Sequence, residues 1–333
     1  MLNVGVIGCG AIGREHIARL SGVISGTKVV AVSDVFEESA QQAAALCNAK
    51  VYKTGAELIA DPQVDAVVVT SPGFAHAESV LQAVQAGKKV FCEKPLATTA
   101  AQCREIVEAE MAAGQHLVQV GFMRRYDSGY RQVKEVIDAR ELGAPLLVHC
   151  THRNPDVAAD YSTEMAVHDT AIHEIDCLHW LIDDEYESVQ VMMPKITSNA
   201  HEGLQDPQLM LLRTKGGICI SLEVFVSCQF GYDINCEVVC ETGTVKLPSL
   251  PTPIIRKEGR VSEGIEMNWK NRFIAAYDVE LQDWADHAQK GMVKGPTAWD
   301  GYIASVTADA LVKSQKTGAI EPVVMEPIPD FYK

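Results

Sequence analysis

Short apolar runs alternate with amphipathic helical stretches along the first 122 residues of the chain. The runs are rich in β-branched residues, which is typical of buried strands, and each following stretch has apolar residues at helical spacing. Strand–helix alternation predicts a parallel sheet covered by helices on both faces. The expected strands are residues 2–8, 28–34, 65–71, 88–94 and 116–122, and the expected helices are residues 11–25, 37–47, 75–87 and 99–114.

The pattern changes near residue 145, where strand-like runs joined by short turns begin to predominate. They predict a second, mostly antiparallel sheet. We therefore divide the chain into domains 1–121 and 122–333, and expect helix 299–316 to pack back on the first domain. The expected strands of the second domain are residues 144–153, 188–195, 208–214, 217–228, 232–247 and 252–257, with 320–325 as an edge strand, and its helices are residues 165–182, 272–290 and 299–316.

Composition and charge exclude several classes of protein. The 333 residues are 47% hydrophobic and 22% charged, which is ordinary for a globular chain of about two domains. The net charge of −15 repels nucleic-acid phosphates and anionic membrane surfaces. No apolar segment approaches the roughly 20 residues of a membrane span, and the N-terminus lacks an export signal. We expect a soluble, cytoplasmic protein that binds neither nucleic acid nor membrane.

The ten cysteines are scattered through apolar neighbourhoods without a C-x-x-C pair. This is typical of buried free thiols in a reducing compartment. Cys236 and Cys240 are separated by three residues, but no second pair or nearby histidine completes a zinc site. We therefore expect no metal.

Residues 165–182 place three ionisable side chains at helical spacing in an otherwise apolar segment. At about 100° per residue, Asp169, His173 and Asp176 fall within an arc of roughly 60°, beside a separate apolar stripe. One face of this helix can pack, and the neighbouring face can carry out chemistry. The alternative is a structural His–Asp pair in a helix–sheet contact.

A glycine-rich motif follows the first strand. Gly8, Gly10 and Gly13 fit G-x-G-x-x-G, in which the glycines permit a tight turn, close approach to a pyrophosphate and close helix–strand packing. The helix N-terminus then faces the anion. This predicts a dinucleotide site that includes Gly8, Gly10, Ala11, Ile12 and Gly13.

Asp34 ends the second expected strand, 21 residues after Gly13. A carboxylate in this position accepts hydrogen bonds from an adenosine ribose. Its charge opposes a 2′-phosphate, and the next three residues supply no compensating Arg or Lys. The cofactor is therefore expected to be NAD and not NADP.

Four motifs occur in a characteristic order along the chain. They are Gly8–Gly13 with His16, Thr70-Ser71-Pro72 with His76, Glu93-Lys94-Pro95 at the end of the expected strand 88–94, and Asp169 with His173. Together they resemble the glucose–fructose oxidoreductase/inositol dehydrogenase/MocA family over nearly the full length. The resemblance implies an α/β fold: an N-terminal Rossmann-type parallel sheet plus a C-terminal α+β domain with an open-faced, mostly antiparallel sheet. It also implies a homotetramer assembled through those sheets, and cofactor contacts from Ser71, His76, Glu93 and Lys94.

The implied reaction is NAD-dependent oxidation of myo-inositol at C2 to the 2-keto product. His173 is expected to be the general base, because imidazole titrates nearest neutral pH. Asp169 would orient His173 and stabilise its imidazolium, and Lys94 would hydrogen-bond the reacting oxygen. The resemblance places six polar side chains around the inositol ring: Arg124, His152, Asn154, Asp176, Tyr232 and Tyr277.

Other interpretations stay open for some of these residues and for the activity. Arg124 is alternatively a surface pair with Arg125, and the two tyrosines are alternatively core rings. Asp176 alternatively orients a neighbouring side chain, and His168 is expected to be a packing or polar-edge residue. Rival substrates are scyllo-inositol, D-chiro-inositol and glucose. Rival functions are an NAD-dependent glycosidase and a non-enzymatic NAD(H) sensor.

Overall fold

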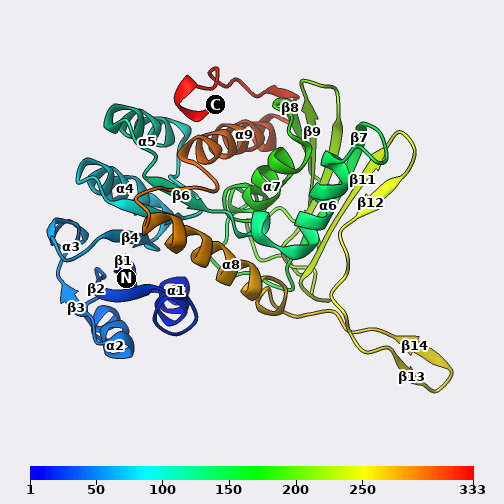
Figure 1. Ribbon diagram of the computed structural model, residues 1–333. Helices are drawn as coiled ribbons and strands as arrows, with labels where there is room; N and C mark the ends of the chain where they lie inside the picture. Colours follow the sequence, from blue (N-terminus) through cyan, green and yellow to red (C-terminus); the bar gives the residue numbers. More distant parts are fainter. The chain divides into compact units, whose positions relative to one another are not determined.

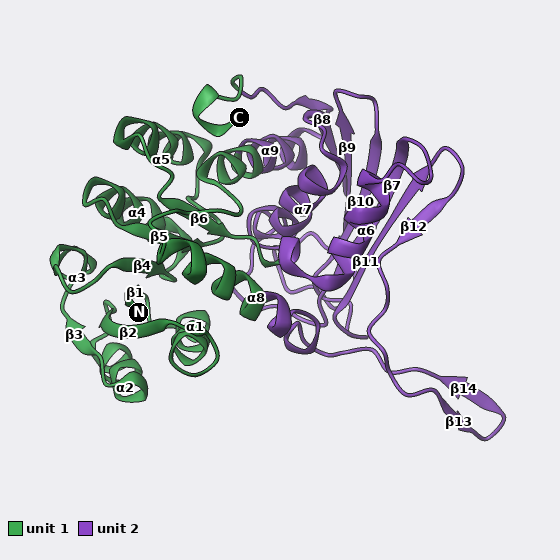
Figure 2. Cartoon of the chain, viewed as in Figure 1, with its two compact units in different colours: residues 1–123, 277–305, 326–333 green, residues 124–276, 306–325 purple.

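The computed structural model describes residues 1–333. The chain forms two compact units, each built from separate stretches of sequence (Figure 2). Unit 1 comprises residues 1–123, 277–305 and 326–333, and unit 2 comprises residues 124–276 and 306–325. No helix of the structure combines the length and the apolar character needed to cross a bilayer.

Unit 1 contains a six-stranded parallel sheet (Figure 1). All four residues of its strand β4 are buried, as in sheets covered on both faces. The strand order is β3-β2-β1-β4-β5-β6, so successive strands are added on one side of β1 up to β3 and on its other side from β4 onward. Ligands of open α/β sheets bind at such a switch point, here between β1 and β4. The strands are β1 (Leu2–Ile7), β2 (Thr27–Ser33), β3 (Lys50–Tyr52), β4 (Ala66–Val69), β5 (Lys89–Glu93) and β6 (Val118–Gly121).

The expected strands and helices of this half are confirmed, and short elements are added between them. Strand β3 has three residues and helix α3 has six, so neither is long enough to show a periodic pattern. A capping box between Thr54 and Glu57 starts α3. The helices are α1 (Ala11–Gly22), α2 (Glu37–Cys47), α3 (Gly55–Ala60), η1 (Gly73–Ala75), α4 (His76–Gln85) and α5 (Ala100–Ala113).

Residues from the C-terminal half of the chain complete unit 1. Helix α8 (Lys270–Ala288) contributes Leu281 and Trp284 to a buried cluster that includes Phe91 of β5. The rings of Phe91 and Trp284 meet edge-to-face with centroids 5.8 Å apart. Helix α9 (Ala298–Thr317) belongs to unit 1 up to Ser305, and the last turn η4 (Asp330–Tyr332) also belongs to it.

Unit 2 contains a seven-stranded sheet in the order β12-β11-β7-β10-β9-β8-β15. Only β7 and β10 pair in parallel, so the predicted mostly antiparallel sheet is confirmed. Buried and accessible residues alternate along the strands, because one face is covered and the other is open. The strands are β7 (Pro145–Arg153), β8 (Tyr186–Met192), β9 (Gln208–Thr214), β10 (Cys219–Phe225), β11 (Asp233–Cys240), β12 (Thr244–Lys246) and β15 (Glu321–Pro322).

The helical elements of unit 2 include one that the sequence pattern did not predict. Helix α6 buries Tyr130, Val133 and Ile137 at helical spacing, but these three apolar residues are interspersed with charges. The predicted helix 165–182 is present in two parts, a π-helical turn and an α-helix. The elements are η2 (Met123–Tyr126), which begins in unit 1, α6 (Ser128–Asp138), η3 (Ala166–Ala171) and α7 (Ile172–Ile182).

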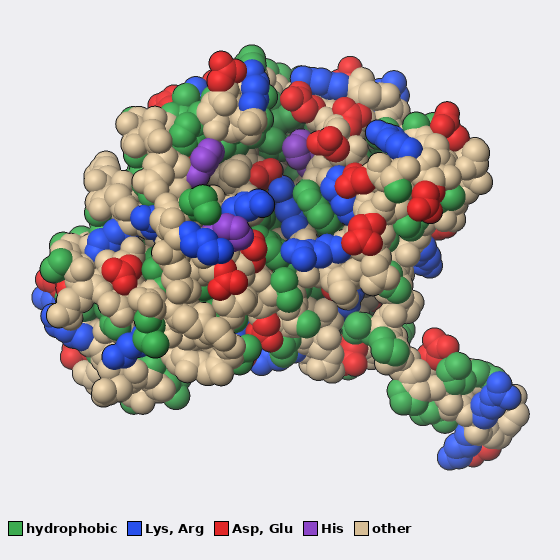
Figure 3. Space-filling view, viewed as in Figure 1, with side chains coloured by type: hydrophobic (Ala, Val, Ile, Leu, Met, Phe, Trp, Pro, Cys, Tyr) green, Lys and Arg blue, Asp and Glu red, His purple; other side chains and the backbone are tan.

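Residues 255–262 form a separate two-stranded sheet, which we call the arm. It consists of β13 (Ile255–Lys257) and β14 (Arg260–Ser262). The sequence pattern assigned residues 252–257 to the second sheet, but β13 pairs with β14 alone. All six strand residues are exposed, and Figure 3 shows hydrophobic and basic side chains on the arm.

Candidate active site

The turn between β1 and α1 is packed so closely that two of its positions require glycine. Gly8 has a φ of +97°, and a Cβ there would lie 2.3 Å from the backbone nitrogen of Ser71. A Cβ at Gly13 would lie 2.1 Å from the carbonyl oxygen of Gly8. Gly10 differs, because a Cβ there would meet no atom within 4 Å. This glycine therefore borders open space.

The start of α1 can bind an anion. Gly10 caps the helix without a side-chain hydrogen bond, and the first turn, which opens with Ala11 and Ile12, has no acidic residue. Backbone N–H groups and the positive end of the helix dipole point out of such a terminus. The hydroxyl of Ser71, beside Gly8, is buried without a hydrogen-bond partner. These features fit the pyrophosphate of a dinucleotide.

Asp34 is fixed beside the same turn. Its Oδ2 accepts the N–H of Cys9 at 2.6 Å, and its Oδ1 accepts the N–H of Phe36 at 2.8 Å. The carboxylate is therefore held after β2, where it can accept ribose hydroxyls. Burial, together with the charge of Asp34, raises the pKa of Cys9 to about 12, so this nearby thiol is not a nucleophile.

His76 connects the loops that follow β4 and β5. Its Nε2 lies 2.6 Å from the carbonyl oxygen of Ser71, and its Nδ1 lies 2.6 Å from the carbonyl oxygen of Pro95. Burial lowers the pKa of His76, against the opposing effect of the two carbonyls. The ring therefore fixes the backbone on the C-terminal side of Lys94. On the other side, the Lys94 N–H donates to Oε2 of Glu93 at 3.2 Å.

In unit 2, Asp169 lies on the π-helical turn η3 and His173 lies on α7. A π-helical turn is wider than an α-helical one, so the angle between these side chains is not the one predicted for a uniform α-helix. His173 is half-buried and Asp169 is exposed. The hydroxyl of Tyr161 braces the turn, since it lies 2.8 Å from the Met165 carbonyl oxygen and 2.5 Å from Oγ1 of Thr170. Burial, together with the charge of Asp169, raises the pKa of Tyr161.

A buried polar network lies next to His173. The rings of His152 and His173 have centroids 6.3 Å apart, and His152 contacts Tyr232 edge-to-face at 5.8 Å. Nδ1 of His152 lies 2.9 Å from Oε2 of Glu174, whose Oε1 accepts from Arg124. The structure thus brings together four of the side chains that the resemblance assigned to catalysis and substrate binding.

Glu174 is the ionised centre of this network. Burial favours its neutral form, but Arg124 and His152 outweigh that effect, so its pKa is lowered. The side chain of Arg124 is only 1% exposed, which excludes the surface pair that was its alternative interpretation. Sequence reasoning missed Glu174, although its position directly after His173 in an apolar segment was a usable signal.

Asp176 is held by a residue that the sequence pattern did not single out. Nε of Arg125 donates to its Oδ2 at 2.9 Å, and Nη2 donates to its Oδ1 at 2.5 Å. The Asp176 side chain is 1% exposed and that of Arg125 is 13% exposed. Asp176 is therefore part of a buried bidentate ion pair. Its contact with a substrate hydroxyl stays a prediction.

The remaining predicted residues have different surroundings. Asn154 follows β7, and its backbone N–H donates to the Phe225 carbonyl oxygen at 2.9 Å. Tyr277 belongs to unit 1, where its ring lies 5.5 Å from that of His16. His168 is half-buried, 3.9 Å from the carboxylate of Asp309, and burial lowers its pKa against the effect of that carboxylate. No cluster of side chains in the structure is suited to a metal ion.

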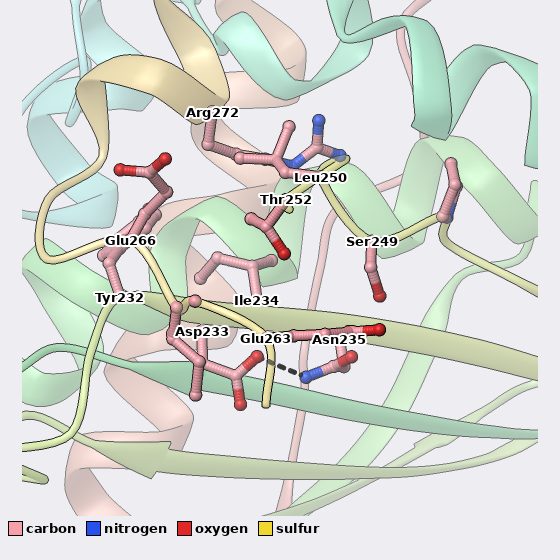
Figure 4. Close-up of a pocket in the computed structure, with 13 residues that line it drawn as sticks. Tyr232, Asp233, Ile234, Asn235, Ser249, Leu250, Thr252, Glu263, Glu266 and Arg272 are labelled. Carbon is pink, nitrogen blue, oxygen red and sulfur yellow. Dashed lines mark hydrogen bonds between the residues drawn. The ribbon is translucent and has the colours of Figure 1, made fainter. Parts of the chain in front are cut away.

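A cavity of about 310 Å³ lies beside β11 in unit 2. Tyr232 lines it, together with acidic side chains such as Asp233 and Glu266 and one cation, Arg272 (Figure 4). Of the predicted site residues, Tyr232 alone lines this cavity. Tyr232 therefore faces both the cavity and the network around His152.

Comparison with known proteins identifies relatives along the whole chain. The family model described as the Gfo/Idh/MocA oxidoreductase family, NAD-binding Rossmann fold, matches residues 2–122, and the model of its C-terminal alpha/beta domain matches residues 134–325. The inositol 2-dehydrogenase of Pseudomonas savastanoi pv. phaseolicola is 54% identical over 99% of both chains. That of Ralstonia nicotianae is 53% identical over 100% of this chain and 99% of the relative. The crystal structure of myo-inositol dehydrogenase from Lactobacillus casei, in complex with NAD(H) and myo-inositol, is 47% identical, covers 100% of both chains and has a TM-score of 0.98.

Proposed function

Because this chain belongs to the Gfo/Idh/MocA oxidoreductase family, we propose that it is an NAD-dependent inositol 2-dehydrogenase that oxidises myo-inositol at C2. The observation that carries the proposal is full-length similarity to inositol 2-dehydrogenases, combined with a glycine turn and an Asp34 carboxylate that fit NAD. The product is 2-keto-myo-inositol. A catabolic role follows if oxidation is the physiological direction.

The alcohol loses a hydride and a proton in this reaction. When bound, NAD supplies the hydride acceptor. We assign the hydroxyl proton to His173, because imidazole is the side chain whose ordinary pKa lies nearest neutral pH. Asp169 then orients the ring and stabilises its positive charge. Lys94 donates a hydrogen bond to the reacting oxygen and stabilises the negative charge that develops there.

We also propose that the predicted polar residues serve the inositol ring in two ways. Arg124 and Asp176 are buried in ion pairs with Glu174 and Arg125, so they fix the shape and charge of the site. His152, Asn154, Tyr232 and Tyr277 present polar atoms to the ring hydroxyls. Because Nδ1 of His152 faces Glu174, its Nε2 is the nitrogen that we assign to substrate.

The test is the appearance of NADH absorbance with NAD or NADP and four substrates, namely myo-inositol, scyllo-inositol, D-chiro-inositol and glucose. We expect the highest kcat/KM with NAD and myo-inositol. A higher value with another substrate would contradict the assignment of substrate. Conversion of a glycoside without net NADH formation would instead indicate a glycosidase, and NADH binding without any turnover would indicate a sensor.

We further propose a cytoplasmic homotetramer assembled through the open face of the seven-stranded sheet. This face exposes Leu147 and Leu211, at 41% and 36%, and all ten cysteines are free, as is typical of a reducing compartment. Light scattering should give four times the chain mass, and Leu211→Glu should reduce it. A monomeric wild-type protein would contradict the proposed assembly.

A further inference from the structure

One buried histidine of unit 1 has no role in the reaction proposed above. His16 lies on α1, one turn after the glycine motif, and is 0% exposed. Its Nε2 lies 2.6 Å from Oε1 of Glu93, which is 5% exposed at the end of β5. These two residues are 77 positions apart in the sequence. The contact therefore links the helix of the dinucleotide motif to the strand that leads to Lys94.

The unpartnered nitrogen of His16 indicates where the proton lies. Nδ1 is buried and has no hydrogen-bond partner. A proton on Nδ1 would leave a buried donor unsatisfied, which is costly. An ionised carboxylate can only accept, so the proton belongs on Nε2, from which it is donated to Glu93.

The surroundings restrict both members of the pair. The ring of His16 meets Phe91 edge-to-face at 5.8 Å and lies 5.5 Å from Tyr277. Phe91 and Glu93 are two residues apart on β5, so they point to the same side of the sheet. A Cβ at Gly121 would lie 3.2 Å from Oε2 of Glu93, so this glycine leaves room for the carboxylate. Neither side chain can move far without disturbing packed neighbours.

The second oxygen of Glu93 reaches Lys94. Oε2 accepts the backbone N–H of Lys94 at 3.2 Å. The orientation of the Glu93 carboxylate thus fixes the backbone from which the Lys94 side chain extends. A hydrogen-bonded path runs from His16 through Glu93 to Lys94.

We propose that His16 is a positioning residue that sets the placement of Lys94 through Glu93. The inference rests on the proposed role of Lys94 in the dehydrogenase reaction. Small displacements of a catalytic group carry large rate penalties, about 100-fold for a shift of about 1 Å. Because His16 and the anion-binding turn share α1, the same helix that fits the pyrophosphate also orients Lys94.

Two substitutions separate the hydrogen bond from the volume of the ring. His16→Leu removes the donor and keeps an apolar side chain of moderate size, whereas His16→Gln can place an amide N–H near the position of Nε2. We expect His16→Leu to lower kcat by about tenfold or more while the Kd of NADH changes by less than about threefold. His16→Gln should restore most of kcat. Combining His16→Leu with Glu93→Gln should lower kcat no further than the more damaging single change, because both act through one path.

A second measurement does not depend on turnover. Lys94 can be labelled with pyridoxal phosphate and borohydride, and the labelled peptide quantified by mass spectrometry. We expect His16→Leu to change the labelling rate of Lys94 by about threefold or more, with the exposed Lys53 as an internal reference. If the wild type fails to oxidise inositol, the proposed function fails, but the labelling still tests the path from His16 to Lys94.

Trp284→Phe is the matched control for stability. Trp284 packs on Phe91 in the same core and makes no hydrogen bond through its Nε1. Both Trp284→Phe and His16→Leu should lower the melting temperature. Trp284→Phe should leave kcat and the labelling of Lys94 unaltered. The proposal is overturned if His16→Leu leaves both Lys94 labelling and kcat within twofold of wild type. It is also overturned if His16→Gln lowers kcat as much as His16→Leu does, or if Trp284→Phe lowers kcat as much as His16→Leu does.

Discussion

At the scale of single residues, Glu174 is the side chain on which the polar network of unit 2 depends. It accepts from Arg124 and contacts Nδ1 of His152, and all three side chains are at most 4% exposed. Removing one partner of a buried ion pair leaves the other charge uncompensated. Glu174 therefore controls both the stability of this network and the orientation of a residue that we assign to substrate.

Glu174→Gln should destabilise unit 2 by about 3 to 5 kcal/mol, because Arg124 then lies buried without its carboxylate. The folded-state pKa of Glu174 is below its ordinary 4.5. Its contribution to the free energy of unfolding is therefore complete above that pH and is lost as the pH falls through the folded value. Urea unfolding at a series of pH values should show a shallower acid loss for the variant. Equal slopes for variant and wild type would argue against an ionised Glu174.

His173→Ala should lower kcat by about 10² to 10⁴-fold, the usual contribution of a positioned general base. The Kd of NADH should stay near that of wild type, because the glycine turn and Asp34 belong to unit 1. Stopped-flow turnover and NADH fluorescence titration measure the two quantities. Near wild-type turnover would remove His173 from the mechanism.

At the scale of secondary structure, the π-helical turn η3 is the element that sets Asp169 apart from the regular helix α7. Such turns are rare and frequently occur at functional sites. Tyr161 braces this one through Met165 and Thr170, and Tyr186 braces α7 through the Ile175 carbonyl oxygen at 2.7 Å. The two tyrosine hydroxyls therefore support adjoining segments with different geometry.

Tyr161→Phe and Tyr186→Phe form a matched pair that tests the π turn. Each removes hydroxyl hydrogen bonds, at about 0.5 to 1.5 kcal/mol for each bond lost. We expect kcat to fall about tenfold for Tyr161→Phe, because Asp169 is displaced, and to stay within about twofold for Tyr186→Phe. Melting temperatures and kcat values of both variants test this expectation. An equal loss of kcat in the two would show that the turn has no special role.

At the scale of the whole molecule, unit 1 is completed by the end of the chain. The hydroxyl of Tyr332 donates to Oε2 of Glu110 at 2.5 Å, and the rings of Phe331 and His116 have centroids 4.1 Å apart. Burial raises the pKa of Glu110, against the effect of Tyr332 and two backbone N–H groups. The last eight residues thus stabilise the unit that carries the dinucleotide site.

Deletion of residues 326–333 should therefore weaken NADH binding as well as lower the melting temperature. Tyr332→Phe, which removes one hydroxyl from a buried carboxylate, should cost about 1 to 3 kcal/mol. Lys333→Ala serves as the control, since its partner Asp330 is exposed. Calorimetry with and without NADH gives both quantities. Unchanged stability after deletion would show that the C-terminal contacts are marginal.

The local features of the chain were predictable because each depends on neighbours in sequence. Alternating strands and helices predicted the parallel sheet, which the strand pairing confirms. Glycine spacing and Asp34 predicted an NAD-binding domain, which the family model confirms, while the individual cofactor contacts stay predictions. The antiparallel second sheet and the edge strand at residue 321 are likewise confirmed. The assignments of Lys94, Asp169 and His173 stay predictions until the variants are measured.

The sequence by itself determined the family, the cofactor and the two kinds of sheet, because periodicity, turn glycines and short motifs act over a few residues. Only the tertiary structure decided which charged side chains are buried and which side chains they pair with. Arg124 and Glu174 are 50 residues apart, and His16 and Glu93 are 77 apart, so no local pattern pairs them. Packing between distant segments likewise places residues 277–305 in unit 1 and produces the π turn at Asp169. Burial and ion pairing are properties of the folded chain, and they select the partner of each ionisable group.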